Sequence, residues 1–322
     1  MDERIVMDDR VANNHLAPLD QVFHLCKEIY AHLDQLNRPV IIIGGQSISY
    51  WLEYFDYVNT LSDADRALAT SVDVDFCGSK DDFLILTERW NVDFQIPSID
   101  QSTPEVGISV LLHKQTGKIT ETDGLMYVDI GAWINNQQEE PNQVDFLELP
   151  MGFKRHDFMN GRLLQHTELF QFPSEFELAP VDNLRVLNPL ACIKSRMLNY
   201  QYLKTAKNPE RELDRIILLF APTALFLQSS LLEFGYRHTR KYIDLLMVLA
   251  KSRIGMDLRF QGIDLSEILV FFVEVQSDNL PRKFVDNEFV EWFAGLERKF
   301  DRKLKEFQRI EEREWNKANA GG

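Results

Sequence analysis

Residues 40–77 constrain the fold most strongly, because they contain an apolar run, a pair of glycines and a short acidic strand in that order. The run Val-Ile-Ile-Ile at 40–43 predicts a buried strand, and Gly44 and Gly45 predict a turn. A helix would begin near Ser47 and continue through the apolar residues up to position 55. This order predicts a strand and a helix that are joined by a tight glycine turn.

The acidic half of this region, residues 71–76, reads Ser-Val-Asp-Val-Asp-Phe and predicts a second strand. Side chains alternate along a strand, so Asp73 and Asp75 would point to the same side while their apolar neighbours face the core. Two carboxylates held side by side cost free energy unless a cation lies between them. Mg²⁺ is the expected cation, because it binds a few carboxylates together with substrate phosphates.

The glycine turn offers a place for an anion. Glycine lets the backbone approach a phosphate closely, and the first amides of the following helix have no partners within the helix. We therefore predict that Gly44, Gly45 and Ser47 bind the β- and γ-phosphates of a nucleoside triphosphate (NTP). A phosphate cradle beside a metal-binding carboxylate pair is what nucleotidyl transfer requires.

A third carboxylate is expected on another strand. Asp145 lies in the alternating segment 143–149, and Asp129 lies in the segment 126–130. We favour Asp145 as the third acidic residue, and Asp129 remains the alternative.

The combination of these segments resembles the DNA polymerase β-like nucleotidyltransferase superfamily over roughly residues 35–153. The shared pattern is an apolar strand, Gly-Gly or Gly-Ser, a helix, an acidic-x-acidic strand and a later acidic strand. Residues 144–147, followed by Gly152, are similar to the third-acid strand of bacterial toxin-type nucleotidyltransferases. The chain departs from the pattern in its longer glycine-to-acid spacing, where residues 56–70 would form an insertion or a longer helix and loop.

The resemblance implies a nucleotidyltransferase that uses an NTP such as ATP. By this resemblance, Asp73, Asp75 and Asp145 would be the catalytic residues and would bind two Mg²⁺ ions. The acceptor would be a protein hydroxyl, an RNA 3′ end or a small molecule such as an aminoglycoside. The resemblance favours a protein or RNA acceptor and places the chain in a toxin–antitoxin or phage-defence system. A non-catalytic subunit with the same fold, which senses a nucleotide or serves in assembly, is the alternative.

A second resemblance concerns residues 188–196, which read Asn-Pro-Leu-Ala-Cys-Ile-Lys-Ser-Arg. They are similar to the helix that follows the catalytic domain in some bacterial and prophage nucleotidyltransferase-like proteins, where a basic residue reaches the triphosphate. The resemblance assigns this role first to Lys194 and then to Arg196. Residues two apart do not share a helix face, so only one of them would point at a given ligand. Two solvated helix charges are the alternative interpretation.

Hydrophobic periodicity and turn residues predict an α+β chain with three parts. These are a flexible segment at 1–14, a nucleotidyltransferase domain with a mixed sheet and flanking helices at 15–180, and an all-helical domain at 181–322. The helical domain ends in an amphipathic helix that we expect to pack onto the body of the protein. Binding of an antitoxin or another partner protein, or self-association, is the alternative use of this helix. The predicted helices are 19–36, 80–90, a helix from 188, 209–227, 229–252, 265–277 and 286–317, and the later strands are 107–113, 125–133 and 143–149.

Composition limits the class of partner and the location. A net charge of −15 disfavours a general nucleic-acid binder, although basic residues outnumber acidic ones between positions 194 and 253. The three cysteines are far apart in apolar segments, which indicates buried thiols in a reducing compartment. The N-terminus lacks the pattern of a signal peptide, and no apolar run is long enough to span a membrane. We expect a cytoplasmic protein that does not bind membranes.

Overall fold

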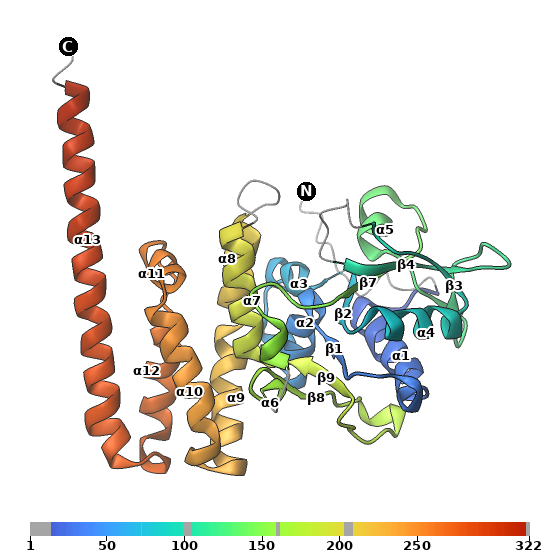
Figure 1. Cartoon of the computed structure of the whole chain (residues 1–322), viewed down its shortest axis with the longest axis horizontal. Helices are drawn as coiled ribbons and strands as arrows, with labels where there is room; N and C mark the ends of the chain where they lie inside the picture. Colours follow the sequence, from blue (N-terminus) through green and yellow to red (C-terminus); the bar gives the residue numbers. More distant parts are fainter. Residues whose placement is uncertain (1–13, 72, 99–104, 159–161, 203–208, 320–322) are drawn as a thin grey trace. The chain divides into compact units, whose positions relative to one another are not determined.

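The structure is a computed structural model that describes residues 14–71, 73–98, 105–158, 162–202 and 209–319 (Figure 1). The chain divides into two compact units, Met1–Pro222 and Thr223–Gly322. The predicted α+β class, with a mixed sheet and a helical C-terminal region, is confirmed. The predicted flexible segment at 1–14 lies outside the described residues, except for Asn14.

A mixed sheet forms the centre of the first unit. Its seven strands in the described residues follow the order β3-β4-β7-β2-β1-β9-β8. The pairs β2–β7 and β1–β9 are parallel, and the remaining pairs are antiparallel. The strands are β1 (Val40–Ile42), β2 (Val74–Cys77), β3 (Val92–Gln95), β4 (Glu105–His113), β7 (Gln143–Leu147), β8 (Thr167–Leu169) and β9 (Leu184–Leu187), and a small ribbon contains β5 (Glu121–Thr122) and β6 (Leu125–Met126).

The helices of the first unit begin where the sequence provides caps. Helix α4 matches the predicted range 80–90, because the Ser79 hydroxyl accepts from the Asp82 amide and Asn91 ends the helix in the left-handed region. The Asn188 side chain likewise accepts from the Ala191 amide at the start of α7. The helices are α1 (Pro18–Tyr30), α2 (Gly44–Tyr54), α3 (Asp63–Ala69), α4 (Lys80–Trp90), α5 (Ile130–Asn136), α6 (Leu163–His166), α7 (Pro189–Tyr202) and α8 (Pro209–Leu218).

The predicted strand at 125–133 is wrong beyond β6. The Asp129 carboxylate accepts from the Ala132 amide at 3.0 Å and caps helix α5. An aspartate at the N-cap competes effectively with extended structure because it satisfies a free amide of the first turn. Asp129 therefore belongs to a helix cap and not to a strand of the central sheet.

Four helices come together beside strands β1 and β2. Helix α2 contacts α3 and α7, and α8 contacts α3 and α7 (Figure 1). The residues that lengthen the glycine-to-acid spacing form a short 3₁₀ turn, Val58–Thr60, and helix α3. Because α7 and α8 pack on these helices, the compact units divide after Pro222, whereas the predicted domains divide after residue 180.

The second unit is helical throughout its described residues. Gly235, at φ +76°, separates α9 from α10, so the predicted helix at 229–252 is two helices. Helix α9 (Phe220–Phe234) crosses the unit boundary and is followed by α10 (Tyr236–Lys251), α11 (Arg253–Phe260), α12 (Ser266–Gln276), a π-helical segment (Phe284–Phe289) and α13 (Val290–Asn319).

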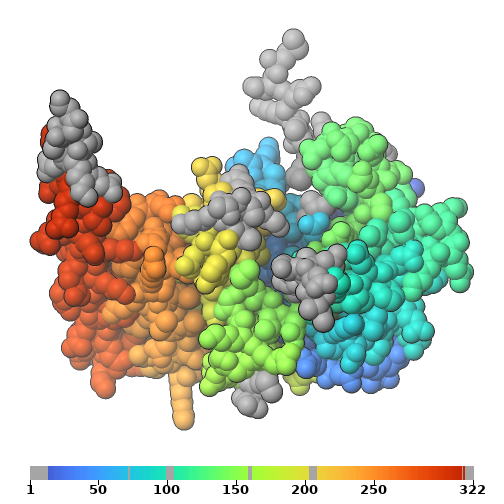
Figure 2. All heavy atoms as spheres, turned by 45° about the horizontal axis from the view of Figure 1, so that its top comes forward, coloured from blue at the N-terminus to red at the C-terminus, as the bar shows by residue number. Residues whose placement is uncertain are grey.

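Two features of these helices bear on partners and location. Helix α13 exposes Phe307, Ile310 and Trp315, and its outer side lies open in the space-filling view (Figure 2). The helical stretch Pro209–Phe234 passes the length and composition test for a membrane span, but 56% of its most apolar window is buried. A core helix of a soluble protein has the same character, so this stretch is weak evidence for a membrane span.

Candidate active site

Asp75 and Asp145 lie side by side on two neighbouring parallel strands. The register of β2 and β7 pairs Asp75 directly with Asp145. Their apolar neighbours point to the other face of the sheet, where the rings of Phe76 and Phe146 lie 5.4 Å apart and Phe83 of α4 covers Phe146. This buried aromatic cluster fixes which face of the two strands carries the carboxylates.

The glycine turn lies directly against Asp75. Gly44 has φ +67°, and a Cβ atom on it would lie 1.9 Å from Asp75 Oδ2. The Ile43 amide donates to the Asp75 carbonyl at 3.0 Å, which holds the end of β1 in place beside β2. The turn therefore requires glycine both for its backbone conformation and for its close approach to a carboxylate.

The second glycine lets the segment before β2 lie close to α2. A Cβ atom on Gly45 would lie 2.4 Å from the Cβ and Oγ atoms of Ser71. The Gln46 side-chain amide donates to the Ser71 carbonyl at 2.6 Å, and the Ser49 hydroxyl donates to the Ala69 carbonyl at 2.6 Å. These bonds fix the segment between α3 and β2 to the first two turns of α2.

Ser47 stabilises the glycine turn through a hydrogen bond. Its side chain is fully buried. The hydroxyl donates to the Gly44 carbonyl at 2.9 Å and accepts from the Cys192 thiol at 3.2 Å. The predicted contact between Ser47 and a phosphate is not supported by this placement, because both hydrogen-bonding directions of the hydroxyl serve the protein.

Asp73 lies at an exposed bend immediately before β2. Within the described residues, no three or more His, Cys, Asp or Glu side chains converge in a way that could hold a metal ion. The carboxylates of Asp75 and Asp145 supply hard oxygen ligands that suit one Mg²⁺, and Gln143 orients Asp145 by donating to Oδ1 at 2.7 Å. The residues fit a single ion, and the predicted set of three carboxylates around two ions has no support in this geometry.

Lys194 and Arg196 point to different surroundings, as their spacing predicts. The Lys194 ammonium lies 4.0 Å from the centre of the Phe153 ring and 3.9 Å from the Asp157 carboxylate. Burial lowers the pKa of Lys194, and Asp157 opposes that effect. Lys194 therefore already has an aromatic face and a carboxylate as partners.

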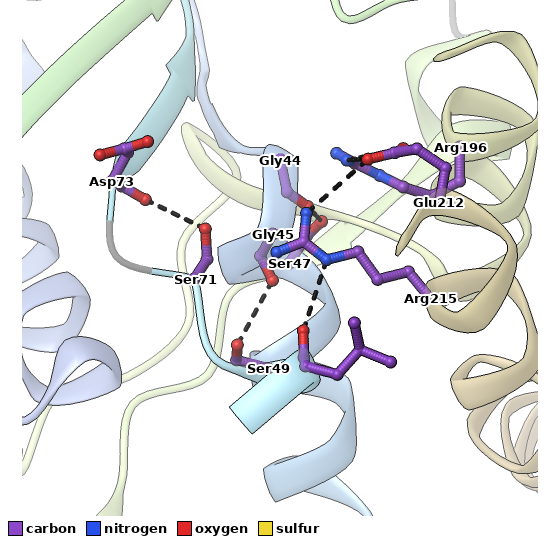
Figure 3. Close-up of polar contacts among 10 residues, drawn as sticks. Gly44, Gly45, Ser47, Ser49, Ser71, Asp73, Arg196, Glu212 and Arg215 are labelled. Atoms are coloured by element: carbon purple, nitrogen blue, oxygen red, sulfur yellow. Dashed lines mark hydrogen bonds and ion pairs between the residues drawn. The ribbon is translucent and has the colours of Figure 1, made fainter. Parts of the chain in front are cut away.

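Arg196 instead belongs to a buried cluster beside the glycine turn (Figure 3). Its Nη1 atom donates to Glu212 Oε2 at 3.1 Å, and Glu212 Oε1 lies 3.9 Å from Arg215 Nη1. Arg215 Nη2 would lie 3.3 Å from a Cβ atom on Gly45. Helices α7 and α8 thus bring two guanidinium groups and one carboxylate to the start of α2.

The electrostatic environment of Arg215 joins this cluster to the carboxylate pair. Burial, together with the charges of Arg196 and Arg211, lowers the pKa of Arg215 to about 10, while Glu212 and Asp75 act in the opposite direction. Arg215 therefore interacts with Asp75 across the glycine turn.

Sequence reasoning missed Glu212 and Arg215. Residues 210–215 read Glu-Arg-Glu-Leu-Asp-Arg, and such a mixture of acidic and basic side chains is typical of a solvated helix face. Helical spacing could have indicated that these two residues are buried. Positions 212 and 215 lie on the same helix face as the apolar residues 216 and 219. No protein-family model, no curated protein and no solved structure matches the chain.

Proposed function

We propose that the chain is a Mg²⁺-dependent nucleotidyltransferase that moves a nucleoside monophosphate from an NTP to a hydroxyl of a protein or an RNA. The observation that carries this proposal is the register pairing of Asp75 with Asp145 directly beside Gly44. Two carboxylates next to the start of a helix bring together a cation site and an anion site, and an NTP bound with Mg²⁺ needs both.

Each side chain at the site has a proposed role. Asp75 and Asp145 would hold one Mg²⁺ ion, whereas Asp73, the third catalytic residue expected from the sequence, lies at the neighbouring bend outside this pair. Mg²⁺ supplies charge neutralisation at the phosphates and lowers the pKa of the attacking hydroxyl. The acceptor hydroxyl loses its proton to solvent, and its oxygen forms a bond to the α-phosphorus. The bond between the α-phosphorus and the oxygen that bridges to the β-phosphorus breaks, and pyrophosphate leaves.

The phosphate tail would lie along the backbone of Gly44 and Gly45. We propose Arg215, with Arg196 behind it, as the cationic groups on that tail, because they lie at the turn. Lys194, the first choice from sequence, is directed to Asp157 and Phe153 instead. Guanidinium groups suit phosphate oxygens because they donate two parallel hydrogen bonds.

The acceptor and the biological setting follow from charge and resemblance. The acidic chain favours a protein or small-molecule acceptor over RNA, and the excess of basic residues between positions 194 and 253 leaves RNA as the alternative acceptor. A cytoplasmic toxin–antitoxin or phage-defence role, with a partner bound to the exposed apolar residues of α13, is part of this proposal.

Thermal unfolding with each NTP, with and without Mg²⁺, tests the proposed site. We expect stabilisation that requires both NTP and Mg²⁺ and that disappears in D75A. Equal stabilisation of D75A would remove the carboxylate pair from the proposal.

A second candidate is a nucleotide-sensing or assembly subunit without transfer activity. The observation that favours this candidate is the position of Asp73, which lies at an exposed bend and not on β2. Only Asp75 and Asp145 are therefore paired in register among the described strands, whereas the superfamily pattern has three acidic residues. Metal-dependent NTP binding without any transfer of label would support this candidate over the enzyme.

A further inference from the structure

The cluster of Arg196, Glu212 and Arg215 is buried in the first unit. Its three side chains are only 8%, 11% and 9% exposed. Glu212 lies between the two guanidinium groups, at 3.1 Å from Arg196 and 3.9 Å from Arg215. One carboxylate therefore serves two buried cations, although charges removed from water need close partners to offset the lost solvation.

Positive charge and hydrogen-bond donors outnumber negative charge and acceptors in the cluster of Arg196, Glu212 and Arg215. Among the residues that the structure describes, Arg196 Nε is buried without a hydrogen-bond partner, and Arg215 Nε makes a long bond of 3.4 Å to the Leu68 carbonyl. Buried donors without acceptors are rare, and each such donor costs free energy. The unsatisfied donor and the excess of positive charge both favour interaction with an additional anionic group.

The location of the cluster indicates which anion it would accept. Arg215 Nη2 lies beside Gly45, at the N-terminal end of α2, where the helix dipole also favours negative charge (Figure 3). Asp75 lies on the other side of the turn. Its negative charge, like that of Glu212, raises the pKa of Arg215. An anion with several oxygens could contact the first amides of α2 and both guanidinium groups together.

We propose that Glu212 competes with the polyphosphate group of a ligand for Arg196 and Arg215. The inference rests on the proposed function and adds regulation of the same site. Glu212 holds the two arginines in place, and a polyphosphate displaces its carboxylate when it binds at the glycine turn. Removal of the Glu212 charge therefore strengthens polyphosphate binding, whereas removal of a ligand-binding residue would weaken it.

Calorimetric titration of the full chain with inorganic triphosphate, in buffer with EDTA, tests this competition. We expect E212Q to bind triphosphate about tenfold more tightly than the unmodified chain. A change of this size is typical of the coupling free energy between two groups that affect each other's binding. D214N is the matched control, because it removes one negative charge from an exposed position of the same helix. Unchanged or weaker binding by E212Q, or an equal gain in D214N, overturns the proposal.

A second measurement needs no substitution and remains decisive if E212Q does not fold. Selective ¹⁵N labelling of arginine Nε gives a resonance for the unpartnered donor of Arg196. Saturating triphosphate should shift that resonance and the one from Arg215, and unmoved resonances would overturn the proposal. Because neither measurement uses a nucleoside or Mg²⁺, failure of nucleotidyl transfer can be separated from failure of the competition.

Discussion

The carboxylate of Asp75 occupies the space that a side chain at position 44 would need, since a Cβ atom on Gly44 would lie 1.9 Å from Asp75 Oδ2. This close approach ties the glycine turn at the end of β1 to the carboxylate pair on β2 and β7. A change at either residue should therefore affect the other, and each of the following predictions tests one part of this arrangement.

Substitution G44A should destabilise the fold more than an alanine at an ordinary turn glycine. G117A is the matched control, because Gly117 also has positive φ (+63°) but nothing lies within 4 Å of its added Cβ atom. We expect about 1 kcal/mol of lost stability for G117A from the backbone alone, and about 1–3 kcal/mol more for G44A from the overlap with Asp75. Urea unfolding measures both, and equal losses would contradict the close approach.

Substitution D145N should separate metal binding from stability. Without Mg²⁺, removal of one of two adjacent like charges should leave the free energy of unfolding unchanged or raise it by up to about 1 kcal/mol. With Mg²⁺, the extra stabilisation by NTP should disappear. Thermal unfolding in EDTA and in Mg²⁺ gives both values, with D93N on the exposed side of β3 as the control. A D145N chain that keeps the Mg²⁺-dependent shift would exclude Asp145 as a ligand.

The two basic candidates from the sequence should behave differently. K194M should change the affinity for inorganic triphosphate by less than about twofold, because Lys194 is bound to Asp157 and Phe153. R215Q should weaken it by about tenfold or more, the effect of losing charge-assisted hydrogen bonds. Calorimetric titration of both variants with triphosphate measures the two affinities. A larger loss of affinity in K194M than in R215Q would show that Lys194, and not Arg215, is the phosphate ligand.

The stability of the first unit should depend on His166 in acid. Burial, with a smaller contribution from Lys194, lowers the pKa of His166 from 6.5 to about 4. Between these values the unfolded chain binds a proton that the folded chain does not, so stability falls as the pH drops from about 6.5 towards 4. H166Q should show a smaller fall between pH 7 and pH 5 than the unmodified chain.

Urea midpoints at the two pH values measure this difference. H156Q is the control, because His156 lies in the same segment and is exposed. An unchanged pH dependence in H166Q would show that His166 is not held neutral by the fold.

The sequence predicted the parts of the site that depend on local pattern. The strand at 40–43, the glycine turn and the acidic strand were readable because apolar runs, glycines and alternation are properties of neighbouring residues. Asp145 lies on the central sheet and Asp129 caps α5, and the role of Asp145 as an acidic residue of the site stays a prediction. The identity of the chain as a nucleotidyltransferase stays a prediction.

The parts that depend on tertiary contacts could not be predicted. Arg215 reaches the carbonyl of Leu68, 147 positions earlier in the chain, and no local pattern indicates that contact. Ser47 is a second example: a hydroxyl after two glycines suggested a phosphate ligand, and no local pattern indicated that packing of α2 against α7 would bury this hydroxyl beside Cys192. The charged side chains of α7 and α8 become buried only through the packing of these two helices on each other and of α8 on α3.

The most direct test of the proposed function is transfer of label from an α-³²P-labelled NTP. The purified chain is incubated with each NTP in turn, Mg²⁺ and cell lysate, and labelled protein and RNA are then resolved. The proposed function predicts a labelled protein or RNA band that is absent with the D75A/D145A variant. No label from any NTP, under conditions in which the chain binds NTP with Mg²⁺, would contradict nucleotidyl transfer and favour the sensing or assembly role.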